Sequence, residues 1–549
     1  MTRSSLAVDS RSAVLDSAHV GDIRGALGTI RHGDVAARGG LSAKAKTLLA
    51  VVGPGLIVMC GDNDAGAFST YGQAGQNYGT TLLWVLLLLV PVLYVNQEMV
   101  VRLGAVTGVG HGKLILERFG RFWGAFSVID LFLLNALTVI TEFIGITLAA
   151  GYLGLPKIPS VIGAGAVVFA AACTGSFRRF ERVALTLCAG SLLLIPVALL
   201  LHPAAGRMAH GFLVPAMPGG AQLSTVMLLI VGLVGTTVAP WQLFFQQSYV
   251  IDKRITTRFL KYEKADLWIG IAIVVIGAAA IIGFSAAAFA GTKGFGHFST
   301  TQTLAQGISA KAGHVAGILF AIALLDASII GAFAVSLSTA YAIGDTFGIN
   351  HSLHRGVKQA KGFYAVYGGL IAIAAAIVLI PGSPLGLITI GVQAMAGVLL
   401  PSASVFLLLL CNDREVLGPW VNGGKTNLFT SAVLGVLVTL SVILTASVLF
   451  PGITAQQIFD IMIGCGAAGL GAAGYALLRR RQAPPAGADA FASLTADEVE
   501  NWRMPPLVEL GKAEMSRLRK IGMSALRLYL IVAAALVVVK IVQLALGGH

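Results

Sequence analysis

The sequence predicts a polytopic α-helical membrane protein, and three observations carry that prediction. First, 56% of the 549 residues are hydrophobic and only 11% are charged, with a mean hydropathy of +0.83, whereas about a quarter of the residues of a soluble domain are charged. Second, apolar runs of about 20 residues recur along the chain, each long enough to cross a hydrocarbon core of about 30 Å. Third, the runs do not show the ten-residue alternating strands of a membrane β-barrel.

We expect twelve or thirteen membrane-spanning helices, which leave no room for a sizeable soluble domain. They are expected at residues 50–75, 80–101, 122–150, 158–174, 183–201, 222–250, 267–291, 315–345, 362–381, 385–411, 428–450, 458–478 and 525–546. The expected organisation is a basic cytoplasmic tail (1–46), a transmembrane core (47–478), a cytoplasmic linker with an amphipathic segment (479–523) and a C-terminal transmembrane helix (524–549).

The Lys and Arg residues are distributed unequally between alternate loops. If the N-terminus is cytoplasmic, 33 of them lie on the inner side of the membrane and five on the outer side. Such an excess is the positive-inside signal of helical membrane proteins. It predicts a cytoplasmic N-terminus in a bacterial-type inner (plasma) membrane, and it explains the net charge of +13 without a nucleic-acid partner. The lipid bilayer is the expected surrounding, and the oligomeric state is left open.

Two of the predicted spans contain residues that interrupt a helix at mid-membrane depth. In the first span, the sequence "GDNDAG" occupies residues 61–66. Glycine is a poor helix former, and Asp and Asn offer the backbone competing hydrogen bonds, so we expect an unwound turn there. In the sixth span, "GLVGTTVAP" occupies residues 232–240, and its proline removes one backbone donor.

Each break lies in the first helix of a five-helix set. Because five is odd, the two sets cross the membrane with opposite topology, and paired breaks in inverted halves point to a transporter's binding site at the midplane. Either break alone is equally well explained as a helix kink. The pair predicts a LeuT-like 5+5 inverted repeat with broken helices 1 and 6, followed by two or three additional C-terminal helices.

Motifs spread over residues 45–450 resemble those of the Nramp (natural resistance-associated macrophage protein) family of divalent metal transporters. The motifs are "GPGLIV" followed by "DAGAFSTYGQAGQNYG", then "RLGAVTG", "TEFIG", "TTVAPWQLFFQQS", and "GVQAMAGVLLP" followed by "CNDREVLG". They occur in the order in which the family has them, which makes the resemblance specific at the level of the fold.

Two site motifs of the family are altered in this chain. The family has Asp-Pro-Gly-Asn in the first helix, where this chain has "DAGA" at residues 64–67, and Met-Pro-His in the sixth, where this chain has "APW" at residues 239–241. The metal-binding aspartate is therefore retained as Asp64. The replaced positions, which are expected to widen the site, are Ala67, Ala239 and Trp241. The pattern resembles the Nramp-related magnesium transporter branch.

The resemblance implies a metal site built on Asp64. Its other expected members are backbone carbonyl groups near Gly61 and Thr236 and the side chain of Glu142 in "TEFIG". A thioether favours softer transition ions, whereas Mg²⁺ prefers octahedral oxygen ligands and keeps several waters. We therefore expect transport of a partly hydrated Mg²⁺, with Mn²⁺ as the other candidate. No cofactor is expected, because the metal is the substrate.

Four further polar residues each leave two explanations open. Asp62 and Asn63 have no counterpart in the family motif; they add oxygen donors to the ion or its waters, or Asp62 caps one half of the broken helix. Gln393 matches a family position near the pathway, but an interhelical hydrogen bond explains it equally well. Asp326 either lines the pathway or pairs with a polar neighbour.

The same residues indicate uptake without proton coupling. Family members take up a proton through the histidine that is Trp241 here, and the aspartate of the third-span pattern is replaced by Val139. We expect uptake driven by the membrane potential, by a transport protein rather than an enzyme. Three alternatives stay open: a proton-coupled Mn²⁺/Fe²⁺ transporter in which Cys60 supplies the lost soft ligand, a sodium-coupled amino-acid carrier, and a non-transporting metal sensor that signals through residues 479–523.

Overall fold

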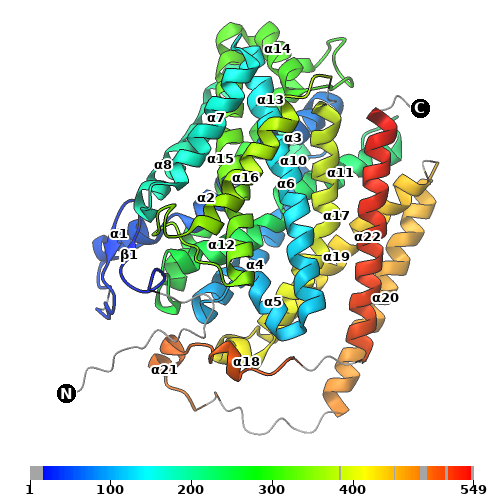
Figure 1. Ribbon diagram of the computed structural model, residues 1–549. Coiled ribbons are helices and arrows are strands. Elements are labelled where there is room, and N and C mark those ends of the chain that lie inside the picture. The colour runs from blue at the N-terminus through cyan, green and yellow to red at the C-terminus, as the bar shows by residue number, and fades with distance from the viewer. Residues whose placement is uncertain are drawn as a thin grey trace.

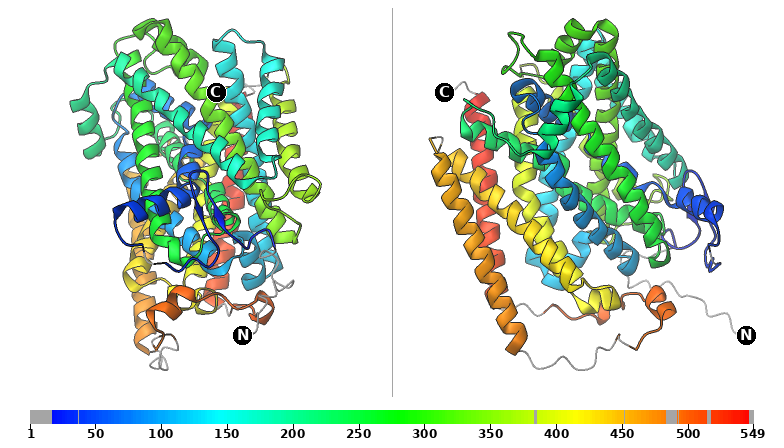
Figure 2. Two further views of the ribbon diagram at one scale, coloured as in Figure 1. Left: turned by 90° about the vertical axis from the view of Figure 1, so that its left-hand side faces the viewer. Right: turned by 180° about the vertical axis from the view of Figure 1, so that it is seen from behind.

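The computed structural model describes residues 17–36, 38–382, 385–450, 452–482, 491, 493–513 and 517–545. The helices of this part of the chain pack side by side in one bundle (Figures 1 and 2). Ten of them are long and apolar enough to cross a membrane, or eleven if a bent pair in the first predicted span counts as one. The prediction was twelve or thirteen. The counts differ because the first span is broken, the fourth is a helix of 16 residues, and the last extends beyond the described residues.

Each predicted span coincides with one helix or with an interrupted run of helices. The first half comprises α1 (Leu41–Val51), α2 (Pro54–Asp62), α3 (Ala65–Tyr78), α4 (Trp84–Thr107), α5 (His111–Phe119), α6 (Arg121–Tyr152), α7 (Lys157–Ala172), α8 (Phe177–Gly190), the 3-10 helix η1 (Ser191–Leu193), α9 (Leu194–Leu201) and α10 (Ala205–Leu213). The second half comprises α11 (Leu223–Thr237), α12 (Pro240–Asp252), η2 (Thr257–Phe259), α13 (Leu260–Phe289), α14 (Thr301–Ala312), α15 (His314–Phe347), α16 (Lys361–Val378) and α17 (Leu385–Cys411). The C-terminal part comprises α18 (Arg414–Leu417), η3 (Gly418–Trp420), α19 (Gly424–Leu449), α20 (Ala455–Gln482), α21 (Ala496–Asn501), η4 (Leu507–Glu509) and α22 (Arg517–Ala545).

The break in the first span is shorter than the predicted unwound turn over residues 61–66. Only Asn63 and Asp64 lie outside the helices, because α2 continues through Asp62 and α3 begins directly after Asp64. α3 begins there because Asp64 is its N-cap: its Oδ1 accepts a hydrogen bond from the backbone N–H of Ala67 at 2.8 Å. Such a cap satisfies one of the free donors of the first helical turn.

The break in the sixth span lies where the sequence predicts it. α11 ends at Thr237 and α12 begins at Pro240, with Val238 and Ala239 non-helical between them. Proline is well placed in the first turn of a helix because its missing N–H would have no partner there.

A second bend lies nearer the start of the first span. α1 and α2 meet at an angle of 54°, and Gly53 between them has a φ of +153°. A Cβ at this position would lie 2.2 Å from Oε1 of Glu181, so the close approach of α8 also requires glycine. α1 consequently leaves the bundle at the left edge of Figure 1.

The polar segments expected to be tail and linker are packed against one end of the bundle wherever they are described. Residues 23–30 form an antiparallel hairpin of β1 (Ile23–Arg24) and β2 (Thr29–Ile30), with both isoleucines buried. In the linker, the N–H of Ala513 donates to the carbonyl oxygen of Arg118 at 2.8 Å. α22 packs against α17 and α19 along the opposite edge of the bundle (Figure 1).

Candidate cation-binding site

The two helix breaks face each other in the interior of the bundle. The hydroxyl groups of Tyr71 in α3 and Thr237 at the end of α11 lie 2.7 Å apart. The side-chain amide of Gln242, in the first turn of α12, donates to the carboxylate of Asp62 at the end of α2. Gln97 of α4 in turn donates to Oε1 of Gln242 at 3.0 Å. These buried hydrogen bonds fix the positions of the four helix ends.

Asp64 and Glu142 form a pair of carboxyl groups at the first break. Both side chains are buried and interact directly with each other. Oε2 of Glu142 also accepts a hydrogen bond from the N–H of Ala65 at 3.2 Å. Two adjacent carboxylates in a low-dielectric interior repel each other strongly. The pair therefore requires a shared proton or a cation.

Two backbone carbonyl groups at the breaks lack their helical partners for identifiable reasons. In a continuous helix, the carbonyl of Gly61 would accept from the N–H of Ala65, but that N–H donates to Glu142. The carbonyl of Thr236 would accept from residue 240, which is proline and has no N–H. Both carbonyl groups also lie in the last turn of a half-helix, at the negative end of its dipole. They are suited to face a positive charge.

Several side-chain atoms around the same breaks are buried without a partner. Within the described residues they include Oδ2 of Asp62, Oδ1 of Asn63, Oε1 of Glu142, Oγ1 of Thr236 and Nε2 of Gln393. The amide of Gln393 lies directly against the backbone of Gly66, since a Cβ there would come within 1.7 Å of Nε2. That nitrogen therefore does not make the interhelical hydrogen bond that was the alternative explanation for Gln393. Because buried polar groups are nearly always hydrogen-bonded, the unpartnered oxygens indicate a place for a cation or water, and the amide nitrogen, which can only donate, indicates a place for water.

Two of the three residues expected to widen the site have small side chains, and the side chain of the third, Trp241, faces α2. Ala67 is buried behind Asp64, to which its N–H donates. Ala239 lies in the extended link before Pro240, and its methyl side chain has no atom that could bind a metal ion. The indole of Trp241 faces α2, where a Cβ on Gly61 would lie 3.4 Å from it.

The other polar residues considered for the ion site, Asp62, Asn63 and Asp326, have different surroundings. Asp62 binds Gln242 and does not cap α3, since Asp64 does so itself. Nδ2 of Asn63 donates to the carbonyl oxygen of Val274 in α13 at 3.3 Å. Asp326 lines a separate small cavity together with Asn63. The structure thus brings Asp64, Glu142 and Gln393 together and leaves Asp62 beside them with an unpartnered Oδ2. Asn63 and Asp326 line the separate cavity instead.

The sequence analysis missed two residues of the site. A Cβ on Gly331 of α15 would lie 2.6 Å from Oε2 of Glu142 and 2.9 Å from Cβ of Asp64, so only glycine leaves room for both acids. Tyr71 lies seven residues, or two helical turns, after Asp64 and therefore on the same face of α3. That spacing was a usable signal for Tyr71, whereas no local signal identifies Gly331.

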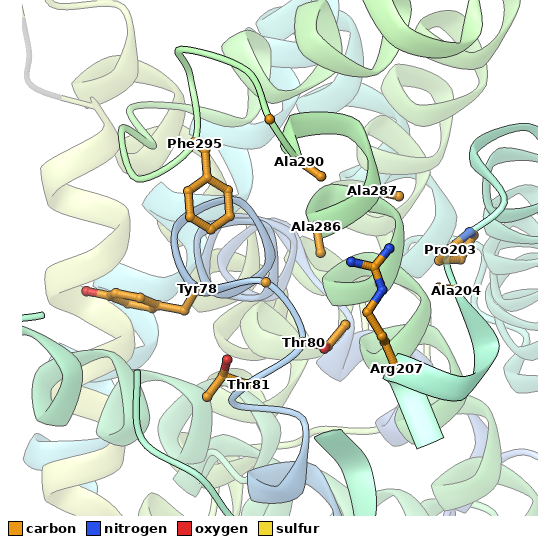
Figure 3. A pocket seen from close by; sticks show the side chains of 13 residues that line it. Tyr78, Thr80, Thr81, Pro203, Ala204, Arg207, Ala286, Ala287, Ala290 and Phe295 are labelled. Atoms are coloured by element: carbon orange, nitrogen blue, oxygen red, sulfur yellow. The ribbon is translucent and has the colours of Figure 1, made fainter. Parts of the chain in front are cut away.

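A larger pocket elsewhere is unsuited to a cation. It has a volume of about 370 Å³ and is lined by Tyr78, Arg207 and Phe295, among others (Figure 3). Tyr78 ends α3, about 20 Å from Asp64 at 1.5 Å per helical residue, and the guanidinium of Arg207 would repel a positive ion. Within the described residues, no group of three or more His, Cys, Asp or Glu side chains is arranged to hold a metal ion. A cation at the breaks would therefore depend on the carboxyl pair, carbonyl and amide oxygens, and water.

Comparison with known proteins identifies relatives of the chain. A family model described as natural resistance-associated macrophage protein-like (Nramp) matches residues 55–447. The divalent metal cation transporter MntH of Pectobacterium carotovorum is 25% identical over 426 residues, which cover 73% of this chain and 94% of that relative. MntH of Deinococcus radiodurans is 30% identical over 301 residues, covering 51% and 65%.

Solved structures match the fold. The crystal structure of a manganese transporter from Eremococcus coleocola aligns with a TM-score of 0.62 at 20% identity, covering 82% of this chain and 98% of that one. The resemblance inferred from the motifs and the predicted LeuT-like architecture are both confirmed by these matches.

Proposed function

The chain belongs to the natural resistance-associated macrophage protein (Nramp) family, and from that premise we propose that it transports a divalent metal cation across a membrane, Mg²⁺ in preference to Mn²⁺, by alternating access. The proposed site consists of Asp64, Glu142 and Gln393 with the carbonyl oxygens of Gly61 and Thr236. The observation that carries the proposal is the pair of adjacent buried carboxyl groups beside two carbonyl groups that the helix breaks leave without donors.

The donor set favours a hard ion that keeps part of its hydration shell. All the proposed ligand atoms are oxygens, and the position where the family has a thioether is Ala239. Mg²⁺ binds through one or two carboxylates and retains several waters, whereas softer transition ions gain from sulfur or imidazole ligands. Ala67 and Ala239 leave space that waters of the ion can use.

We propose that the membrane potential drives uptake without proton coupling at this site. Trp241, in the position of the family's histidine, cannot carry a proton, and Val139 replaces an acid. For a divalent ion, a potential of 100 mV supplies about 4.6 kcal/mol, which is twice the value for a single charge. The positive-inside pattern supports an orientation in which the end of the bundle that carries the N-terminal hairpin faces the cytoplasm.

A second candidate is a proton-coupled transporter of Mn²⁺ or Fe²⁺, and the names of the relatives, a divalent metal cation transporter and a manganese transporter, support Mn²⁺ as its ion. This function calls for a softer ligand, and Cys60 was the sequence candidate for it. The side chain of Cys60 lines the cavity that contains Cys188 and Asp326, which argues against that role.

Uptake by the purified chain in liposomes distinguishes these functions. Initial rates would be measured for Mg²⁺, Mn²⁺ and Ca²⁺ under an imposed negative-inside potential, with and without a pH gradient. The proposal predicts Mg²⁺ uptake that follows the potential and does not change with the pH gradient. Uptake restricted to Mn²⁺ and dependent on the pH gradient would favour the second candidate. Absence of any metal uptake would favour a sensor.

A further inference from the structure

A small cavity lies beside the first helix break, separate from the proposed metal site. Its lining includes Cys60, Asn63, Leu187, Cys188 and Asp326, from α2, the first break, α8 and α15. Its volume of about 10 Å³ is close to the minimum that holds one water molecule. The occupant is therefore a single water-sized particle.

Asp326 brings a carboxyl group to this cavity. Among the described residues, no hydrogen-bond donor or basic group pairs with its carboxylate. An ionisable side chain inside a membrane helix is costly and usually has a partner or a function. The carboxylate lies against Gly190 of α8, where a Cβ would come within 2.1 Å of Oδ2, so glycine leaves the space that the acid uses.

Two further oxygen atoms at the cavity lack partners. Oδ1 of Asn63 is buried and has no donor within the described residues, while Nδ2 of the same amide is bound to α13. On the opposite wall of the cavity, the α-helical hydrogen bonding of α8 changes to the tighter pattern of the 3-10 helix η1. The N–H of Ser191 there donates to the carbonyl oxygens of Ala189 and Cys188 rather than to that of Leu187, which leaves the Leu187 carbonyl without its helical partner.

We propose that this cavity is a second cation site, in which Asp326, Asn63 and the Leu187 carbonyl bind one Na⁺. A single acid matches a single positive charge, and the three residues come from three different elements that line a space for one ion. A divalent ion would remain under-neutralised there, and a proton alone would leave the Leu187 carbonyl without a partner.

The second site is positioned to act on the metal site. Asn63 and Asp64 are the two non-helical residues between α2 and α3. An ion held by Asn63 therefore restrains the turn that presents Asp64. Bound Na⁺ would order the first break before the divalent ion arrives and so raise the affinity for it.

Thermal unfolding of the purified full-length chain tests the site without relying on transport. The midpoint would be measured against NaCl concentration, with choline chloride keeping the ionic strength constant. We expect the wild-type midpoint to rise with Na⁺ and to saturate. Asp326→Asn should abolish this rise, whereas Asp130→Asn, which changes another intramembrane acid, should retain it.

A second pair of variants covers the case in which Asp326→Asn fails to fold. Gly190→Ala places a methyl group against the carboxylate and should also abolish the Na⁺ effect. Gly163→Ala adds the same group on α7, where nothing lies within 4 Å, and should leave the effect intact. A wild-type chain insensitive to Na⁺, or an equal rise in Asp326→Asn, would overturn the proposal. So would a midpoint that follows pH but not Na⁺, because the acid would then hold only a proton.

Discussion

The half-helix α2 is held in contrasting ways at its two ends. At its N-terminal end, Nζ of Lys253 donates to the Val52 carbonyl at 2.8 Å and to Glu181 at 2.6 Å. Asp266 accepts backbone hydrogen bonds at 3.1 and 2.7 Å from the two glycines that flank Pro54. We call Glu181, Lys253 and Asp266 the inner anchor. The contacts described above for the C-terminal end include no basic side chain. There the Gly61 carbonyl lacks its helical donor, and Oε1 of Glu142 has no hydrogen-bond partner within the described residues.

We call the N-terminal end of α2, at the inner anchor, the fixed end, and its C-terminal end, at Asp64, the receiving end. The inner anchor neutralises its acids with a lysine and with backbone N–H groups, and the hairpin joins it, since the N–H of Ala26 donates to Glu181 at 2.6 Å. The break at Asp64 lacks such neutralisation, which an incoming cation would supply under the proposed function. Release of that ion past the N-terminal end of α2 would require the inner anchor to separate.

The largest expected effect comes from removing the charge at the receiving end. Asp64→Ala should lower divalent uptake about a hundredfold or more, because loss of one partner from a buried charged interaction costs at least about 3 kcal/mol. Initial uptake rates in liposomes measure this loss. Asp460→Ala, which removes an exposed acid from α20, is the matched control and should transport normally. Normal uptake by a folded Asp64→Ala chain would remove Asp64 from the site.

The next effect concerns the fixed end. Lys253→Met leaves Glu181 buried without its counter-charge and should destabilise the fold by about 3–5 kcal/mol. Unfolding by SDS titration measures the change. Adding Glu181→Gln to the same chain should recover much of the loss, because the unpaired charge is then gone. If the double variant is as unstable as the sum of the two single variants, the pair is not coupled and the inner anchor is misassigned.

The receiving end was largely predictable from sequence because its signals are local. Asp64 and Pro240 begin new helices through their own chemistry, so the positions of both breaks follow from residue type. Gly61 does not interrupt the helix, since α2 continues through Asp62. The pairing of Asp64 with Glu142 came from the family resemblance and not from spacing. The directions of the Asp62 and Asn63 side chains did not follow, since they depend on Gln242 and on Val274 in helices far along the chain.

The fixed end was not predictable because it, too, depends on contacts between segments that lie far apart in the sequence. Residues 17–36 were taken as part of a cytoplasmic tail because they lack an apolar run. Their burial instead comes from polar contacts, such as the guanidinium of Arg254 donating to the Ala18 carbonyl at 2.7 Å. Such contacts leave no periodic pattern in the sequence. The inner anchor likewise joins Glu181 and Lys253 across 72 residues.

A pH dependence of stability is expected from the pair of His351 and Asp345. His351, in the loop after α15, is buried, which lowers its pKa, but the carboxylate of Asp345 at 2.8 Å outweighs burial and raises the pKa from 6.5 to about 9. The protonated form is thus favoured by folding. This contribution is fully present below about pH 6.5 and is lost as the pH rises through about 9.

The size of this effect follows from the pKa shift, which corresponds to about 3 kcal/mol. SDS unfolding of the wild-type chain should weaken by that amount across this pH range, while His351→Gln should lack this part of the dependence. His354→Gln, at the neighbouring histidine, is the comparison. An unchanged pH profile in His351→Gln would show that the pair with Asp345 does not control stability.

The smallest expected effect sharpens the chemistry of the receiving end. Ala239→Met places a thioether at the second break, next to the unpartnered Thr236 carbonyl. A thioether adds affinity for softer ions and gives nothing to Mg²⁺, so uptake of Mn²⁺ and Cd²⁺ relative to Mg²⁺ should rise about tenfold, which corresponds to about 1.4 kcal/mol. Ala239→Leu adds similar bulk without sulfur and should lower all rates without changing their order. Equal selectivity in the Met and Leu variants would mean that the absence of a soft ligand does not set the preference of this site.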